Sequence, residues 1–252
     1  MNDTKTFERK MFISGRNLET VAAWHGLSRE ALLDHIRQAG PDGLVIDTGS
    51  GRSPIFSEVI DAVDPTVRPF LAAIDTDPAC VDVVQETIPP GTPKVTVENV
   101  SGLDMCKKFG DNSASLIIAS FLFPYWNTNK QEGNQFIDEL YSTLKPGGKA
   151  LLAPLYLQPG PSARHDAREM TQTQREEFFD HLKSVERDFV EELYKRQKAG
   201  EINLSFRYAL DELDQIPMST DPRLTEVSPK RYPHWYDHYG VGLAVEITKS
   251  EP

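Results

Sequence analysis

The chain has 252 residues, of which 39% are hydrophobic and 26% are charged, a composition typical of a globular protein and not of a disordered one. Its 38 acidic residues outnumber the 27 basic ones, and the formal net charge of -11 disfavours binding to the phosphates of a nucleic acid. The two cysteines, Cys80 and Cys106, are too few for a disulfide framework or a zinc site, so we expect no metal.

The sequence shows no sign of membrane insertion or export. Its apolar runs are all shorter than the roughly 18 residues that span a bilayer. The opening MNDTKTFERK also lacks the apolar segment of a signal peptide. We therefore expect a cytoplasmic protein that makes no membrane contact.

Two short helical patterns come first along the chain. One ends near Gly26, and the other begins after Ser28, which is a suitable N-cap. The second carries Leu32 and Ile36 on one face and ends at Gly40. These patterns predict an N-terminal helical region.

Short apolar strands then alternate with helices. We expect strands at 44–46, 70–74, 95–97, 116–120 and 150–155, with helices at 55–63, 78–87 and 129–144. This order predicts an α/β fold with a doubly wound, mostly parallel, seven-stranded sheet.

The alternation breaks after residue 155. A polar stretch leads into a long helical pattern at 172–198, and an apolar strand follows at 241–247. We therefore divide the chain into an N-terminal helical lid (1–40), a ligand-binding core (41–157), a helical cap inserted after strand five (158–222) and terminal strands that complete the sheet (223–252).

A glycine-rich turn follows the first predicted strand. Gly49 and Gly51 allow the strand to turn sharply and a ligand to approach the backbone. Asp47 stands two residues before the first glycine, where it would repel a pyrophosphate. The turn therefore favours a positively charged nucleoside over a dinucleotide, although such a glycine pair also occurs in plain tight turns.

A second acidic signal ends the next strand, in Asp75-Thr76-Asp77-Pro78. An acidic residue at this place in doubly wound sheets accepts hydrogen bonds from ribose hydroxyls. Asp77 directly precedes a proline and suits the N-cap of the following helix. This assignment leaves Asp75 free for a ribose.

These motifs together resemble the class I S-adenosylmethionine-dependent methyltransferase family. Asp47, Gly49 and Gly51 are similar to its glycine-rich first motif, and Asp75 to its ribose-binding acid. The segment 140–149, LYSTLKPGGK, resembles the turn before the fifth strand of that family. Asp104 is similar to the residue that contacts adenine. The resemblance covers roughly 43–155.

The resemblance implies S-adenosyl-L-methionine as cofactor and methyl transfer as activity. The implied cofactor-binding residues are Asp47, Gly49, Gly51, Ser53, Asp75, Thr76, Asp104, Met105, Ser120 and Phe121. Two positions depart from the family: Ser53 replaces the third glycine, and Ser115 replaces the usual acid before strand four.

The acceptor is expected beyond strands four and five. Methyl transfer depends mainly on holding the nucleophile in line with the methyl group, so few catalytic groups are needed. We name Tyr125, Asn127 and His165 as catalytic candidates, and Tyr125, Trp126 and Tyr156 as substrate-binding candidates. A solvated His165 and a purely structural aromatic loop remain the alternatives.

An aromatic segment near the C-terminus, 231–239, could form a water-excluding lid together with Arg16, Asn17 and Trp24. The alternative is a surface segment packed on the cap, or a dimer contact.

The sequence thus predicts a small-molecule methyltransferase, with secondary metabolism as its expected setting, that acts as a monomer or homodimer without nucleic-acid partners. One alternative is an enzyme that uses the same cofactor to cyclise or transfer its aminocarboxypropyl arm and releases methylthioadenosine. Another is a nonenzymatic binding module, which the presence of both Asp47 and Asp75 disfavours.

Overall fold

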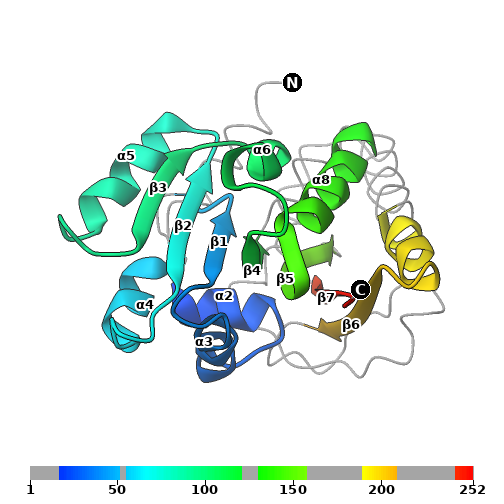
Figure 1. Cartoon of the computed structure of the whole chain (residues 1–252), viewed down its shortest axis with the longest axis horizontal. Coiled ribbons are helices and arrows are strands. Elements are labelled where there is room, and N and C mark those ends of the chain that lie inside the picture. Colours follow the sequence, from blue (N-terminus) through cyan, green and yellow to red (C-terminus); the bar gives the residue numbers. More distant parts are fainter. Residues whose placement is uncertain (1–16, 52–54, 121–129, 158–188, 209–241, 252) are drawn as a thin grey trace, which may run out of the picture.

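The computed structural model describes residues 17–51, 55–120, 130–157, 189–208 and 242–251, and its centre is a seven-stranded sheet (Figure 1). The strands are β1 Leu44–Thr48, β2 Phe70–Asp75, β3 Val95–Asn99, β4 Ala114–Ser120, β5 Leu144–Leu157, β6 Ile202–Tyr208 and β7 Gly242–Lys249. Their order is β3-β2-β1-β4-β5-β7-β6. Strands β1 to β5 pair in parallel, whereas β7 is antiparallel to both β5 and β6. The predicted fold class is confirmed.

Helices cover both faces of the sheet. They are α2 Leu18–Trp24, α3 Arg29–Gln38, α4 Phe56–Ala62, α5 Pro78–Thr87, the 3-10 helix η1 Gly102–Asp104, α6 Met105–Phe109 and α8 Lys130–Thr143. Residues 189–198 are also helical and lie beside α8 in Figure 1. The predicted caps of α3 and α5 are confirmed, because Ser28 accepts from the Ala31 N–H and Asp77 from the Ala79 N–H.

Alternate strand residues divide the core into two clusters. On one side, which we call the α2 face, buried residues of α2 to α5 pack on Val45, Leu116 and Ile118. On the other side, the α8 face, buried residues of α6, α8 and the 189–198 helix pack on Ile46 and Ile117. A sheet covered on both faces explains why its central strands are continuously apolar.

Strand β6 lies earlier in the chain than the sequence indicated. It falls within 158–222, the range assigned to the helical cap, and not within the terminal strands of 223–252. Its apolar Ile202, Leu204 and Phe206 alternate with polar residues, the pattern of a strand at the edge of a sheet. The adjacent helical stripe includes Phe189 and Leu193, which are buried as predicted, and residues 172–188 lie outside the described ranges.

A carboxylate and three basic side chains meet on the α2 face. Glu246 of β7 pairs with Lys149 of β5 and Arg207 of β6, and lies 3.8 Å from Nε2 of His35 on α3. Burial opposes the charge of Glu246, but these cations outweigh it and hold the pKa of the carboxyl below its usual value. The pKa of His35 is lowered too, in this case by burial.

Both shifts make the fold less stable in acid. A depressed carboxyl pKa contributes stability above the pKa of the unfolded chain, and this stability is lost as pH falls through the folded value. We expect Glu246→Gln to lower the free energy of unfolding near neutral pH and to lose this difference in acid. Urea unfolding of both proteins between about pH 7 and about pH 3 measures it. A deficit that is constant over this range would contradict the assignment.

Across the part of the chain that the structure describes, no helix combines the length and the apolar composition needed to cross a bilayer.

Candidate functional site

The order of the strands places the topological switch point of the sheet between the ends of β1 and β4. From β1 the chain continues to β2 and β3 on one side, whereas β4 and β5 lie on the other. Ligands of open α/β sheets bind at such a switch point, outside the carboxyl ends of the strands. Because Thr48 pairs with Ala119, the next residues, Gly49 and Ser120, flank this point.

The glycine turn after β1 bends toward the end of β2. Gly49 and Gly51 have φ angles of 67° and 59°, in the left-handed region that favours glycine. The Ser50 N–H donates to the Ile74 carbonyl at 3.0 Å, and the Gly51 N–H donates to Oδ2 of Asp75 at 2.9 Å. The turn is therefore fastened to the strand that carries the predicted ribose acid.

Asp75 has a structural duty that the sequence analysis did not foresee. Its Oδ2 accepts from Gly51, and its Oδ1 accepts from the Asp77 N–H at 2.9 Å. Asp77, and not Asp75, caps α5, as predicted, whereas ribose binding by Asp75 stays a prediction. A carboxylate offers about four acceptor positions, so two hydrogen bonds leave capacity for ribose hydroxyls. Thr76 follows directly and is exposed.

Asp47 is the penultimate residue of β1 and has no exposed surface. It shares the α2 face with Val45, two residues earlier. Burial of a carboxylate is costly, and in a low-dielectric site its charge acts strongly on nearby groups. An acid placed here favours a cationic ligand at the adjoining turn.

A third segment that carries predicted site residues follows β3, in η1 and α6. The side chain of Asp104 is exposed at the end of η1, whereas Met105 is fully buried in the α8-face cluster. In this structure Met105 therefore offers no exposed surface to a ligand, and its predicted contact with the cofactor stays a prediction.

Gly102 allows η1 to lie directly against β1. A Cβ at residue 102 would come within 2.8 Å of Oγ1 of Thr48 and 3.2 Å of the Phe136 ring. We expect Gly102→Ala to lower the free energy of unfolding by about 1–3 kcal/mol, because overpacking displaces η1. In the double variant, Thr48→Ala should restore part of this loss of stability. Urea unfolding of the single and double variants measures it, and additive losses would contradict the contact between residue 102 and Thr48.

The structure adds one residue that the sequence analysis missed. His25, which follows α2, contacts Ser120 at the end of β4, with 3.1 Å between Nε2 and Oγ. Both side chains are almost completely buried, with exposures of 1% and 3%. The 95 positions between them explain why no local motif indicated the contact. Trp24, proposed for a lid, instead belongs to the α2-face core.

Several predicted site residues lie outside the described ranges. These are Ser53, Phe121, Tyr125, Trp126, Asn127 and His165. Tyr156 lies in β5, where its backbone pairs with Leu243, and its side chain is not among those described. The catalytic and substrate-binding assignments therefore stay predictions.

Neither a metal nor a reactive thiol is found in the described part of the site. The residues described there include no group of three His, Cys, Asp or Glu side chains placed to hold a metal ion. The thiol of Cys106 donates to Asp111 at 2.8 Å, and this hydrogen bond raises its pKa to about 11. Cys106 is therefore protonated at neutral pH and unsuited to nucleophilic attack.

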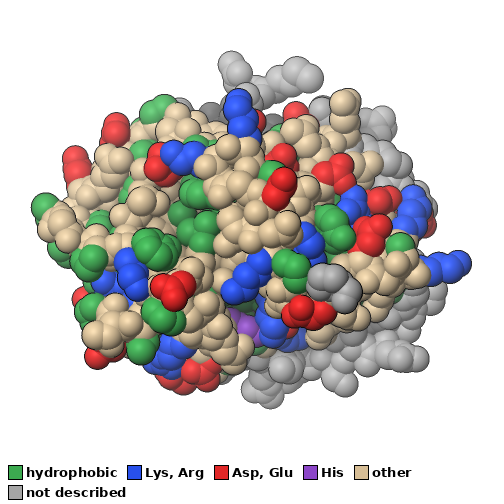
Figure 2. Space-filling model, viewed as in Figure 1, with side chains coloured by type: hydrophobic (Ala, Val, Ile, Leu, Met, Phe, Trp, Pro, Cys, Tyr) green, Lys and Arg blue, Asp and Glu red, His purple; other side chains and the backbone are tan. Residues whose placement is uncertain are grey.

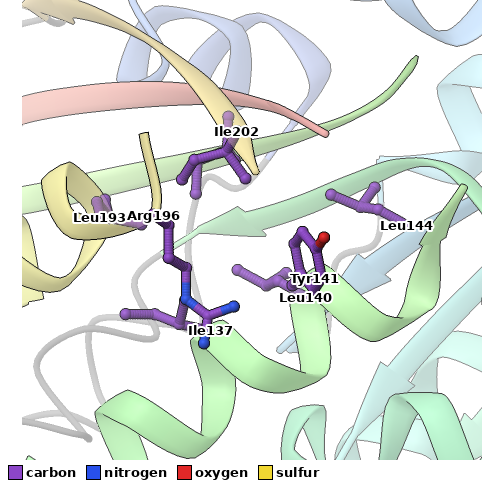
Figure 3. A pocket seen from close by; sticks show the side chains of 8 residues that line it. Ile137, Leu140, Tyr141, Leu144, Leu193, Arg196 and Ile202 are labelled. Atoms are coloured by element: carbon purple, nitrogen blue, oxygen red, sulfur yellow. The ribbon is translucent and has the colours of Figure 1, made fainter. Parts of the chain in front are cut away.

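A separate apolar pocket lies on the α8 face, between α8, the 189–198 helix and strands β6 and β7 (Figure 3). Its lining consists of Ile137, Leu140, Tyr141, Leu144, Leu193, Arg196, Ile202 and Ile247. Arg196 pairs with Asp138 and lies 5.4 Å from the centre of the Tyr141 ring. None of the described residues that line this pocket is a carboxylate, so the switch point is the better site for a cationic nucleoside.

Comparison with known proteins relates the sequence to a family of domains. Residues 46–152, which run from β1 into β5, match the family model of the methyltransferase domain. No curated protein matches the sequence.

Solved structures with TM-scores of 0.50 or more share the fold at low sequence identity. A Methanococcus maripaludis protein assigned as an S-adenosyl-L-methionine-dependent methyltransferase has a TM-score of 0.52 and 14% identity, over 99% of this chain and 92% of that one. An rRNA methylase from Streptococcus thermophilus has a TM-score of 0.50 and 10% identity, and the match covers 87% of this chain and 95% of that one. An O-methyltransferase from Thermotoga maritima has a TM-score of 0.47 and 13% identity, and the match covers 88% of this chain and only 64% of that one.

Proposed function

Because the chain carries a class I S-adenosylmethionine-dependent methyltransferase domain at residues 46–152, we propose that it methylates a small molecule at the β1–β4 switch point. One observation carries the proposal: the glycine turn after β1 is fastened to Asp75 at the edge where parallel strands place their ligands.

The residues at this edge suit the cofactor. Asp75 retains acceptor capacity for the ribose hydroxyls, and the exposed Asp104 suits the adenine amino group. Asp47, buried two residues before the turn, would as a carboxylate favour a ligand that carries an ammonium and a sulfonium. A Cβ added at Gly51 would meet nothing within 4 Å, so the described residues leave space beside the turn.

The chain's own contribution is alignment. S-adenosylmethionine, when bound, supplies a methyl group that its sulfonium has already activated. The turn, held by Ser50 and Gly51, and the acid at the end of β2 fix the nucleoside end. The end of β4, on the other side of the switch point, then forms the acceptor side. Holding an acceptor in line with the methyl group would supply most of what methyl transfer requires.

The charge of the chain supports a small acceptor over a nucleic acid. The net charge of -11 repels phosphates, and Figure 2 shows acidic and basic side chains interspersed on the visible face. The rRNA methylase from Streptococcus thermophilus acts on RNA by its name, but 10% identity supports a shared fold alone. Within this proposal, Tyr125, Trp126 and Tyr156 bind the acceptor, and Asn127 and His165 assist the transfer.

Product analysis tests the proposal. The purified protein is incubated with S-adenosylmethionine, alone or with a panel of phenols, amines, carboxylic acids and thiols, and the nucleoside product is identified by mass. We expect S-adenosylhomocysteine only when an acceptor is present. Methylthioadenosine formed without an acceptor would instead support the cyclising or aminocarboxypropyl-transferring alternative, and methylation of added rRNA but of no panel compound would overturn the small-molecule assignment.

A further inference from the structure

His25 is held rigidly by the end of helix α2. The Leu27 N–H donates to the Ala22 carbonyl and the Gly26 N–H to the Ala23 carbonyl. Gly26 has a φ of 67°, so these hydrogen bonds form a Schellman motif with His25 as the C-cap. The backbone of His25 therefore has little freedom, and its imidazole is directed from a fixed point.

The imidazole meets β4 at the switch point. Leu116 and Ile118 belong to the α2-face cluster, and Ser120, in phase with them, points toward the same face. There Oγ of Ser120 lies 3.1 Å from Nε2 of His25. Because Ala119 pairs with Thr48, this contact stands beside the first glycine of the cofactor turn. The hydrogen bond thus joins the N-terminal helix to the acceptor side of the switch point.

We propose that His25 is a positioning residue for methyl transfer, which holds Ser120 and thereby the acceptor side of the switch point at the end of β4. The inference rests on the proposed function. A neutral imidazole offers one donor and one acceptor nitrogen, and whichever of the two faces Ser120, the hydrogen bond holds Oγ in place. Displacement of an aligning group by about 1 Å can slow a reaction a hundredfold, so loss of this hydrogen bond should slow transfer and spare cofactor binding.

Three variants and one control test the pair. His25→Leu and Ser120→Ala remove the hydrogen bond, whereas His25→Gln keeps a side-chain amide able to make it. Ser28→Ala is the matched control, because it weakens the neighbouring helix α3 through its N-cap, by about 1 kcal/mol, without contact to Ser120. For each protein, calorimetry gives the Kd for S-adenosylhomocysteine, urea gives the free energy of unfolding, and the fastest panel acceptor gives kcat and KM.

We expect His25→Leu and Ser120→Ala to lower kcat by roughly ten- to a hundredfold, and His25→Leu, which leaves the predicted cofactor-binding residue Ser120 intact, to keep a Kd for S-adenosylhomocysteine within about twofold of the wild type. His25→Gln should recover most of kcat, and Ser28→Ala should keep it. The inference is overturned if His25→Leu retains wild-type kcat, or if Ser28→Ala loses as much kcat as His25→Leu at equal loss of stability.

A second measurement does not depend on an acceptor. Nitrogen NMR of the imidazole in the S-adenosylhomocysteine-bound protein reports the environment of Nε2. We expect the Nε2 signal of His25 to change in Ser120→Ala. An unchanged signal would contradict the hydrogen bond between His25 and Ser120. A wild-type protein that binds S-adenosylhomocysteine but methylates no panel compound counts against the proposed function, while the NMR result still decides the pair.

Discussion

Replacement of Asp75 by alanine is expected to raise the Kd for S-adenosylhomocysteine by roughly ten- to a hundredfold. The loss of hydrogen bonds from ribose to a charged acceptor accounts for about 1.5–3 kcal/mol of binding free energy. The same change leaves the N–H groups of Gly51 and Asp77 without their acceptor, so the glycine turn loses its fastening to β2. Titration calorimetry measures the binding, and urea unfolding measures the accompanying loss of stability.

Asp77→Ala is the matched control for Asp75→Ala. Asp77 is two residues away and caps α5 through the Ala79 N–H, so its loss should cost about 1 kcal/mol of stability. It should change the Kd for S-adenosylhomocysteine little. Equal affinities for the wild type and Asp75→Ala, or an equal loss of affinity in the two variants, would contradict the role given to Asp75.

Replacement of Lys249 by methionine is expected to lower the free energy of unfolding by about 2–4 kcal/mol. Lys249 ends β7 and is 9% exposed, and its Nζ donates to Oδ1 of Asn112 and to the carbonyls of Tyr141 and Leu144 at 2.7–2.8 Å. The Tyr141 carbonyl lies in the last turn of α8 and the Leu144 carbonyl directly follows that helix, so Nζ stands at the C-terminal end of α8, where a cation is favourable. Methionine fills similar space but leaves the three acceptors without this donor.

Lys195→Met is the control for Lys249→Met. The side chain of Lys195 is 72% exposed and pairs only with Glu192 among the ion pairs of the described residues. A surface pair of this kind contributes about 0–1 kcal/mol. Urea unfolding of both variants measures the two losses of stability. Similar losses would contradict a stabilising role of the hydrogen bonds that Lys249 donates at the end of β7.

The sequence predicted the parts of the site that depend on local rules. Positive φ angles at Gly49 and Gly51 and the cap formed by Asp77 follow from residues within a few positions of one another. The order of strands and helices followed from hydrophobic periodicity in the same way. These features are encoded locally and do not depend on how distant segments meet.

Features that depend on tertiary contacts were missed. The hydrogen bond from Gly51 to Asp75 joins neighbouring strands, and the contact of His25 with Ser120 joins the first helix to β4. Burial of Met105 depends on α8, which packs over it only in the folded chain. Strand β6 was overlooked because a strong helical pattern precedes it and its own alternation is short.

The most direct test of the binding site is a crystal structure of the protein with S-adenosylhomocysteine. The account predicts the nucleoside at the β1–β4 switch point, with its ribose hydroxyls within hydrogen-bonding distance of the Asp75 carboxylate. A nucleoside bound instead in the pocket between α8 and the 189–198 helix would contradict it, as would a dinucleotide whose phosphates lie beside Asp47.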